Sequence, residues 1–257
     1  MRFCSLGSGS TGNATVVETG SGAAVTRVLI DCGFSLRELD LRLARAGLEA
    51  SMLDAVFVTH EHGDHIGSAV ALSRRDAIPL WMSRGTWRAV RRPDLPAIRH
   101  ARDGETIAIG GLELHPFTVA HDAEEPLQLR CSDASHQLGV LTDAGSITSH
   151  MLDNLQGCHA LLLECNHDRA MLDASRYPAS LKARIGGRFG HLDNDTSAEI
   201  LAACLHDGLR HLVAAHLSEE NNRPELVLGA LAGAWGAARE QIVVADPQRG
   251  CGWITVG

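Results

Sequence analysis

Short apolar runs, separated by polar and glycine-containing stretches, recur along the whole chain. Most runs have the length of a buried strand rather than that of a helix. Gly110 and Gly111 separate two of these runs as a hairpin turn does. Besides a short strand at the start, the expected strands are residues 25–30, 55–58, 80–82, 106–109, 112–119, 127–130, 137–141, 160–163, 212–215, 242–245 and 253–256. Strands therefore dominate the middle of the chain.

Segments with apolar residues at helical spacing bracket these strands. In residues 35–47, Ser35 is the expected N-cap, Glu38 is its capping-box partner and Gly47 ends the helix. The buried face of this helix consists of Leu36, Leu39, Leu43 and Ala46. Thr196 is expected to begin another helix, with Glu199 completing a capping box. Further helices are expected over residues 66–75, 178–185 and 224–235, and residues 84–92 are expected to form an arginine-rich helix or loop.

The order of these elements predicts an α/β fold in which two mixed β-sheets lie face to face with helices outside. This arrangement is an αββα sandwich. A chain of 257 residues is at the upper end of a single domain and can bury a large core. Because the sequence shows neither an internal repeat nor a low-complexity linker, we expect one domain over residues 1–257.

Composition and charge narrow the class of protein. No segment has the length and purity of a membrane span, and the first residues lack the apolar stretch of a secretory signal, so we expect a cytoplasmic protein that does not contact membranes. The seven scattered cysteines form no C-x-x-C pair, which predicts reduced core residues. A net charge of −8 argues against broad attraction to nucleic acid. Arginine-rich stretches at 84–102 and at 184–188 are compatible with a local basic surface that binds phosphate, although a solvated charged face is the commoner explanation of such stretches.

The densest group of chemically capable side chains follows the apolar run at residues 55–58. His60, His62, Asp64 and His65 lie within six residues, in the pattern H-x-H-x-D-H. In an extended loop, residues two apart point to the same side, so His60 and His62 can hold one ion while Asp64 and His65 turn to a second. Imidazole and carboxylate ligands suit zinc, with iron or manganese as alternatives. The competing explanation is a polar loop that only caps a helix.

Four more candidate ligands also follow expected strands. Asp31, His121, Asp143 and His216 each stand at the end of an apolar run or within two residues of it. Because side chains at strand ends converge on one rim of a sandwich, we expect these four residues to meet the histidine cluster there.

The pattern at residues 60–65 resembles the signature of the metallo-β-lactamase fold superfamily. This resemblance implies that seven residues hold two divalent ions: His60, His62 and His121 the first, Asp64, His65 and His216 the second, with Asp143 bridging them. It also implies that Asp31 orients the histidine loop by hydrogen bonding. Two such ions supply hydroxide at neutral pH, which implies hydrolysis. The additional carboxylates of the redox-active diiron relatives are absent, which disfavours an oxidase.

A narrower resemblance runs nearly from end to end. The segments 6–13, 31–35, 59–65, 166–168, 177–178, 181–185, 190–192 and 215–222 resemble the YycJ (WalJ) group of bacterial cytoplasmic proteins associated with 5′-to-3′ exonuclease activity on DNA. One departure is Gly-His-Leu-Asp-Asn, in which Asp193 stands where the group has serine. The resemblance implies a catalytic group of Asp64, Asp143 and His191.

The group is also similar to the β-CASP nucleases, although the large insert of those enzymes is missing. By that similarity, His191 holds the scissile phosphate or protonates the leaving oxygen. Other residues expected to contact substrate phosphate are Ser8, Ser10, Asn13, His167, Lys182 and Arg184, with Arg188 as a further candidate. For the Gly/Ser-rich residues 6–13, a plain hairpin loop is an equal alternative.

The leading functional hypothesis is a dinuclear metal phosphodiesterase acting on nucleic acid, as a DNA exonuclease working from the 5′ end. A thioester or lactone hydrolase shares every metal ligand, but should enclose its substrate in a pocket. A non-catalytic regulator stabilised by metal is the third hypothesis, and a β-lactamase is the least favoured. The sequence does not determine which metal is bound, whether the substrate is DNA or RNA, the polarity of cleavage or the oligomeric state.

Overall fold

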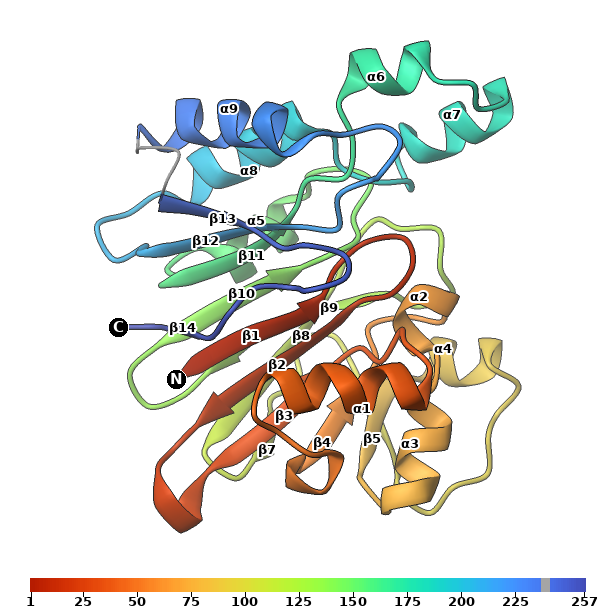
Figure 1. Ribbon diagram of the computed structural model, residues 1–257, viewed down its shortest axis with the longest axis vertical. Helices are drawn as coiled ribbons and strands as arrows, with labels where there is room; N and C mark the ends of the chain where they lie inside the picture. Colours follow the sequence, from red (N-terminus) through yellow and green to blue (C-terminus); the bar gives the residue numbers. More distant parts are fainter. Residues whose placement is uncertain (237–240) are drawn as a thin grey trace.

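The computed structural model describes residues 1–236 and 241–257, and it confirms the predicted αββα sandwich (Figure 1). Two sheets of seven strands each lie face to face, and helices cover their outer faces. Within the described residues, every helix is too short or too polar to cross a bilayer.

The first sheet is built from the N-terminal part of the chain and closed by the last strand. Its spatial order is β14 (Ile254–Thr255), β1 (Arg2–Gly7), β2 (Ala14–Thr19), β3 (Thr26–Ile30), β4 (Ala55–Phe57), β5 (Leu80–Ser83) and β6 (Ile98–Ala101). The strands from β3 to β6 are parallel, whereas β14, β1, β2 and β3 pair antiparallel. The carboxyl ends of β3 and β4 therefore open at the same rim.

The second sheet follows the same plan. Its order is β13 (Ile242–Val244), β12 (His211–Ala215), β11 (Ala160–Glu164), β10 (Gln137–Leu141), β9 (Leu127–Ser132), β8 (Leu112–Thr118) and β7 (Ile107–Ile109). The strands β10 to β13 are parallel, and β7 to β10 form an antiparallel meander. Three parallel strands, β10, β11 and β12, thus deliver the residues that follow them to one edge.

Helices pack on both outer faces. The first sheet is covered by α1 (Leu36–Arg45) and α3 (Ala69–Asp76), with α2 (Gly63–Ile66) and α4 (Arg84–Ala89) near its edge. The second sheet is covered by α5 (Ser149–Leu155), α8 (Asn194–Cys204) and α9 (Pro224–Trp235). The short helices α6 (Arg169–Ala174) and α7 (Ala179–Ile185) project beyond the second sheet (Figure 1). Two 3₁₀ turns, η1 (Gly22–Ala24) and η2 (Ala50–Met52), complete the elements.

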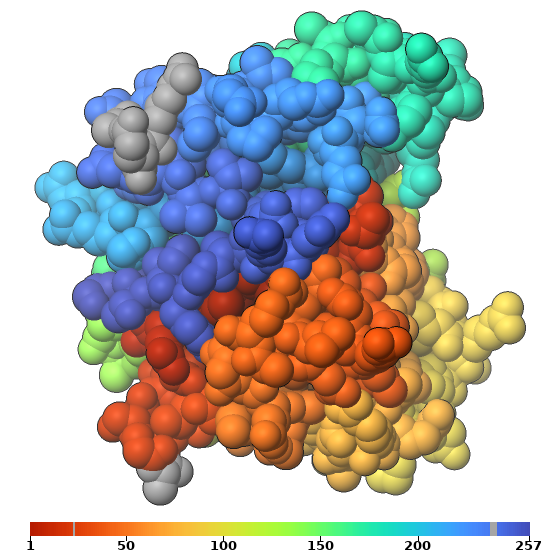
Figure 2. Space-filling model, viewed as in Figure 1, coloured from red at the N-terminus to blue at the C-terminus, as the bar shows by residue number. Residues whose placement is uncertain are grey.

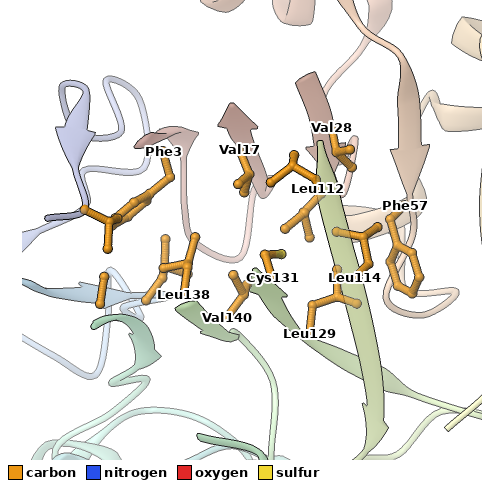
Figure 3. Packing of buried hydrophobic residues seen from close by; sticks show 14 of the residues in the cluster. Phe3, Val17, Val28, Phe57, Leu112, Leu114, Leu129, Cys131, Leu138 and Val140 are labelled. Atoms are coloured by element: carbon orange, nitrogen blue, oxygen red, sulfur yellow. The ribbon is translucent and has the colours of Figure 1, made fainter. Parts of the chain in front are cut away.

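The main core lies between the two sheets (Figure 3). Phe3, Val17, Val28 and Phe57 project from the first sheet toward side chains of the second, among them Leu114 of β8. Alternate residues of the same strands face outward, where they meet the helices in two further clusters. This alternation is the two-residue period of strands buried on both faces.

All seven cysteines are free thiols, and six of them are buried. Burial raises the pKa of Cys4 and of Cys158 to about 12. The cysteines therefore act as small apolar residues of the core.

Two helix predictions need correction. Residues 66–75 do not form one helix, because α2 ends at Ile66 and α3 begins only at Ala69. Between them Gly67 adopts φ 30°, and a Cβ at this position would lie 2.5 Å from the carbonyl oxygen of Cys32. The tight packing of this turn against residues 32 and 33 separates the two helices.

The second correction concerns α8, which does not begin at Thr196 with a capping box. Its N-cap is Asp193, whose carboxylate accepts the backbone N–H groups of Asp195 and Thr196 at 3.0 Å each. The same carboxylate lies 2.8 Å from Arg169. Since serine and aspartate are both strong N-caps, the departure at position 193 preserves the helix start.

We expect Asp193→Ala to lower the free energy of unfolding by about 1 kcal/mol, because two backbone N–H groups lose their acceptor. Asp193→Ser should retain most of the stability, since its hydroxyl can accept one of these bonds. Urea denaturation followed by circular dichroism measures both variants. Equal destabilisation by alanine and serine contradicts the capping role.

Candidate metal centre

The predicted ligands meet at one rim of the sandwich. His60, His62, Asp64 and His65 lie in the loop after β4 and in α2, and Asp31 follows β3. From the second sheet come His121 after β8, Asp143 after β10 and His216 after β12. These loops come from both sheets, so the site forms only when the two sheets pack together.

One group of potential metal ligands contains His60, His62 and His121, whose ligand atoms all lie within 4.8 Å of one another. The Nδ1 atom of His60 lies 3.0 Å from the hydroxyl of Thr59, and that of His121 lies 2.9 Å from the carbonyl oxygen of Gly190. These contacts fix the two rings and turn each Nε2 toward the other members of the group, with His121 Nε2 3.2 Å from His62 Nδ1. An oxygen partner on the far nitrogen is the usual support of a metal-binding histidine.

A second group contains Asp64, His65 and His216. His65 Nδ1 lies 2.7 Å from Asp31, and His216 Nδ1 donates to the carbonyl oxygen of Thr142 at 2.7 Å. The Nε2 atoms of His65 and His216 then face Asp64 Oδ2, at 3.5 and 3.4 Å. Both rings are therefore held from behind in the same way as those of the first group.

Asp143 lies between the two groups. Its Oδ2 is 2.8 Å from His65 Nε2, and its Oδ1 is 3.8 Å from His121 Nε2. Asp143 Oδ1 also lies 3.1 Å from Nδ1 of both His191 and His216. None of these contacts is an aligned hydrogen bond within the described residues, and His60 Nε2 and His216 Nε2 lack one as well. Buried polar atoms almost always find a hydrogen-bond partner. These four nitrogen and oxygen atoms therefore fit a divalent cation.

The electrostatics of the rim favour ionised carboxylates. Burial disfavours the charge on Asp64, but the imidazoles of His216 and His65 hold the pKa of this carboxyl well below its usual range. The same two imidazoles hold the pKa of Asp143 well below its usual range despite complete burial. Both residues are thus available as anionic ligands at neutral pH.

Asp31 supports the histidine loop as expected from its position. Its carboxylate accepts the backbone N–H of Thr59 at 2.8 Å and the Thr59 hydroxyl at 3.0 Å, besides contacting His65. Asp31 itself adopts φ 61°, a left-handed conformation that costs free energy for a residue with a Cβ. This strained residue contacts His65, one of the candidate ligands.

Sequence reasoning missed Glu164, the last residue of β11. Its Oε1 lies 2.8 Å from His191 Nδ1, and its Oε2 accepts the N–H of Ala144 at 2.8 Å. The side chain is fully buried, and it also belongs to a ligand group with Asp143, His191 and His216. The available signal was a glutamate at the end of an apolar strand. Without a motif around it, this glutamate could not be distinguished from a polar residue that only marks the end of the strand.

His191 lies beside the candidate metal ligands. Burial opposes its protonation, but the carboxylates of Asp143 and Glu164 raise the pKa of His191 to about 9. With Nδ1 directed at Glu164, the other nitrogen is turned toward a cavity of about 310 Å³. The cavity is lined by Ser10, His62, Gly63, Asp64, Asp143, Arg184, His191 and His216.

Two of the predicted phosphate contacts, Ser10 and Arg184, line this cavity. Arg184 is exposed, and its Nε lies 2.6 Å from Asp122, the residue after His121. This ion pair holds the guanidinium over the rim. Arg188 is exposed as well, and its guanidinium carbon lies 5.4 Å from the ring centroid of Phe189.

Ser8 and Asn13 are not among the residues that line this cavity, but both contact candidate ligands. Ser8 accepts the N–H of His216 at 2.9 Å and donates to Asn13 at 3.0 Å. Asn13 Nδ2 lies 3.1 Å from His65 Nε2 and 3.4 Å from Asp64 Oδ2. The Gly/Ser-rich segment is thus the hairpin loop between β1 and β2, and it also braces the ligands.

His167 and Lys182 lie outside the metal group, in a separate cavity of about 350 Å³. His167 is buried, and its Nδ1 finds no partner in the described part of the chain. Lys182 Nζ donates to the carbonyl oxygen of Asp173 at 2.6 Å. The helix α7 contributes to both cavities, since Arg184 lines one and Lys182 the other.

Comparisons with known proteins agree with this geometry. The profile of the β-lactamase superfamily domain matches residues 26–217. Exodeoxyribonuclease YycJ of Bacillus anthracis is 33% identical over 230 residues, covering 88% of this chain and 86% of the relative. Exodeoxyribonuclease WalJ of Streptococcus pneumoniae serotype 2 is 31% identical over 231 residues, covering 88% and 84%. Among solved structures, the metallo-β-lactamase fold protein YhfI from Bacillus subtilis superposes with a TM-score of 0.75 at 15% identity over 98% of each chain.

Proposed function

Because this chain belongs to the β-lactamase superfamily and carries a metal-binding cluster of histidines and carboxylates, we propose that it cleaves nucleic acid as a 5′-to-3′ DNA exonuclease. The chain is a metal-dependent hydrolase of the metallo-β-lactamase fold. The observation that carries the choice of substrate is the alignment with two exodeoxyribonucleases over 88% of the chain. The seven free cysteines suit a reducing compartment such as the cytoplasm.

The proposed centre holds two divalent ions. Their ligands are His60, His62 and His121 for the first and Asp64, His65 and His216 for the second, with Asp143 between them. Nitrogen and oxygen ligands of this kind suit zinc, and manganese or iron are the alternatives. When bound, such a pair of ions makes hydroxide available near neutral pH and stabilises negative charge on the attacked group.

His191 is proposed to act on the phosphate group of the substrate. Its Nδ1 is fixed by Glu164 at 2.8 Å, so its Nε2 faces the cavity and can donate a proton to the leaving oxygen or a hydrogen bond to the phosphate. Glu164 is then a positioning residue, because it orients the imidazole without reaching the cavity. This anchoring keeps one defined nitrogen of the half-buried imidazole directed at the substrate.

Arg184 and Ser10 are proposed to bind the substrate at the mouth of the same cavity. A guanidinium with parallel donors suits a phosphate oxygen pair. The ion pair with Asp122 offsets this charge while keeping it next to His121. His167 and Lys182 stay predictions as phosphate contacts, from a separate cavity to which α7 also contributes.

A small-molecule hydrolase is the second candidate, because a cavity of about 310 Å³ is at the lower end of the range for small ligands. A thioester or a lactone could bind to the same metal ligands. The two candidates differ in the class of bond that is cleaved fastest.

A substrate panel distinguishes them. Protein loaded with zinc, manganese or iron is mixed with 5′-phosphorylated single- and double-stranded DNA, RNA, a thioester and a lactone, with Asp64→Ala as the control. We expect mononucleotides from DNA, with a kcat/KM above that of every small ester, and no release by the control. Turnover of the thioester or lactone without nucleotide release contradicts the proposal. Unfolding on metal removal without hydrolysis of any ester supports a metal-stabilised regulator instead.

A further inference from the structure

Four arginines lie on α4 and the turn that follows it. Residues 84–92 contain Arg84, Arg88, Arg91 and Arg92 and no acidic residue, in a chain whose net charge is −8. All four side chains are exposed. We call these four residues the α4 arginine patch.

Most of this charge is uncompensated. Within residues 1–236 and 241–257, Arg84, Arg91 and Arg92 form no ion pair, and Arg88 has a single one, to the exposed Glu124 at 3.3 Å. Exposed guanidinium groups so close in sequence concentrate positive charge, which attracts polyanions. The patch is therefore a cationic surface in an otherwise acidic protein.

Two residues of the patch, Arg91 and Arg92, have a strained backbone conformation. Arg91 adopts φ 65° and Arg92 φ 53°, so two consecutive residues with a Cβ occupy the left-handed region. The turn is closed by bonds from Arg91 N–H to Arg88 O at 3.1 Å and from Arg92 N–H to Trp87 O at 2.9 Å. Glycine or asparagine would adopt this conformation at lower cost, and strain of this kind concentrates at functional sites.

Hydrogen bonds connect α4, through the loop after β8, to the loop that carries His60 and His62. The N–H of Gly85 donates to Glu125 Oε2 at 2.6 Å, and the N–H of Glu124 donates to Glu61 Oε1 at 2.6 Å. Glu61 lies between His60 and His62, and Glu124 is three residues after His121. The position of α4 is thus fixed relative to the proposed site of cleavage.

The patch also lies on the same side of the molecule as the second group of cations. In Figure 1, α4 and α7 both lie at the right, with α2 between them. In Figure 2, the outline is indented between the yellow segment that contains α4 and the teal segment that contains α6 and α7. Arg184 lies on the α7 side of the metal cavity. In this view, α4 thus lies on the same side of the molecule as the helix that carries Arg184.

We infer that the α4 arginine patch binds the phosphate backbone of the nucleic-acid substrate several nucleotides away from the scissile bond. The inference rests on the proposed function and assigns it a second binding surface. Each arginine that meets a phosphate releases counterions, so binding should weaken with salt. A substrate too short to reach the patch should be unaffected by it.

The test compares two triple variants with the same net charge. The patch variant is Arg84→Gln/Arg91→Asn/Arg92→Asn, in which asparagine suits the left-handed positions. The control is Arg37→Gln/Arg74→Gln/Arg210→Gln, three exposed arginines without an ion pair in the described part of the chain. Hydrolysis of a linear 30-nucleotide DNA and of bis(4-nitrophenyl) phosphate is measured at several salt concentrations, and melting temperatures check the fold.

We expect the patch variant to lose about tenfold in kcat/KM on the 30-nucleotide DNA, mainly through KM. The slope of log kcat/KM against log salt concentration should become shallower by about 2 in this variant. Each phosphate that an arginine no longer neutralises lowers the slope by close to one unit. Activity on bis(4-nitrophenyl) phosphate should stay within about twofold of the parent, and the control should match the parent on both substrates.

Equal behaviour of the two triple variants on DNA overturns the inference and leaves the proposed function intact. A parent protein that cleaves no DNA contradicts the proposed function instead. In that case, fluorescence anisotropy of the labelled 30-nucleotide DNA decides the inference. Binding weakened only in the patch variant supports it, whereas binding that is absent or equal in both variants overturns it.

Discussion

Asp143→Asn will lose bound metal and lower kcat/KM on DNA by on the order of 10³-fold or more, which is about 4 kcal/mol of transition-state stabilisation. Asp143 faces both ligand groups, and its carboxylate oxygens make no aligned hydrogen bond among the described residues. Asparagine keeps the shape of the side chain but removes the negative charge that the ions share. The change should therefore act through the metal and not through packing.

Metal content and activity are measured on the same preparations. The parent should bind two equivalents by elemental analysis, and Asp143→Asn at most one. Asp153→Asn is a matched control, because Asp153 is exposed on α5 and its substitution makes the same chemical change away from the site. Two equivalents retained in Asp143→Asn with normal activity would show that Asp143 does not bridge.

His191→Ala will lower kcat by about 10² to 10⁴-fold, the usual loss when a proton donor is removed from a reacting group. Metal content should stay at the parent's level, because the proposed ligand set is complete without His191. Glu164→Gln should lower kcat less, since the imidazole remains but loses its anchoring carboxylate. Loss of metal in His191→Ala would instead identify His191 as a ligand.

A double-mutant cycle tests whether Glu164 acts through His191. The two side chains lie 2.8 Å apart, so their effects should not add. We expect Glu164→Gln to lower kcat in the parent and to have little effect in the His191→Ala background. Additive losses would assign Glu164 an independent role, such as direct metal binding with Asp143 and His216.

The amino-acid pattern is sufficient to predict the sandwich but not every element. Residues 137–141 are predicted with the same bounds as β10, because Leu138, Val140 and Leu141 make the segment strongly apolar. The pattern misses β2 (Ala14–Thr19), which lies beside a polar loop. It also misses β6 (Ile98–Ala101), because Arg99 and His100 interrupt the apolar character of this strand. The helices α5 and α6 have seven and six residues, too few for a period to emerge.

For the site, the position of a residue at the end of a strand is the feature that predicts candidate ligands best. They predict that His121, Asp143 and His216 meet the histidine loop, and the structure brings these residues together. Glu164 obeys the same rule but has no motif around it, so only its contact with His191 identifies it. His167 joins the expected phosphate contacts by resemblance alone, and only the fold separates its cavity from that of the metal ligands.

The most direct test of the proposed activity compares linear with circular single-stranded DNA of the same sequence, incubated with the metal-loaded protein. An exonuclease needs a chain end, so we predict mononucleotides from the linear strand, an intact circle and no product from either after metal removal. Cleavage of the circle at the rate of the linear strand, or persistence of both in the presence of zinc, manganese and iron, would contradict it.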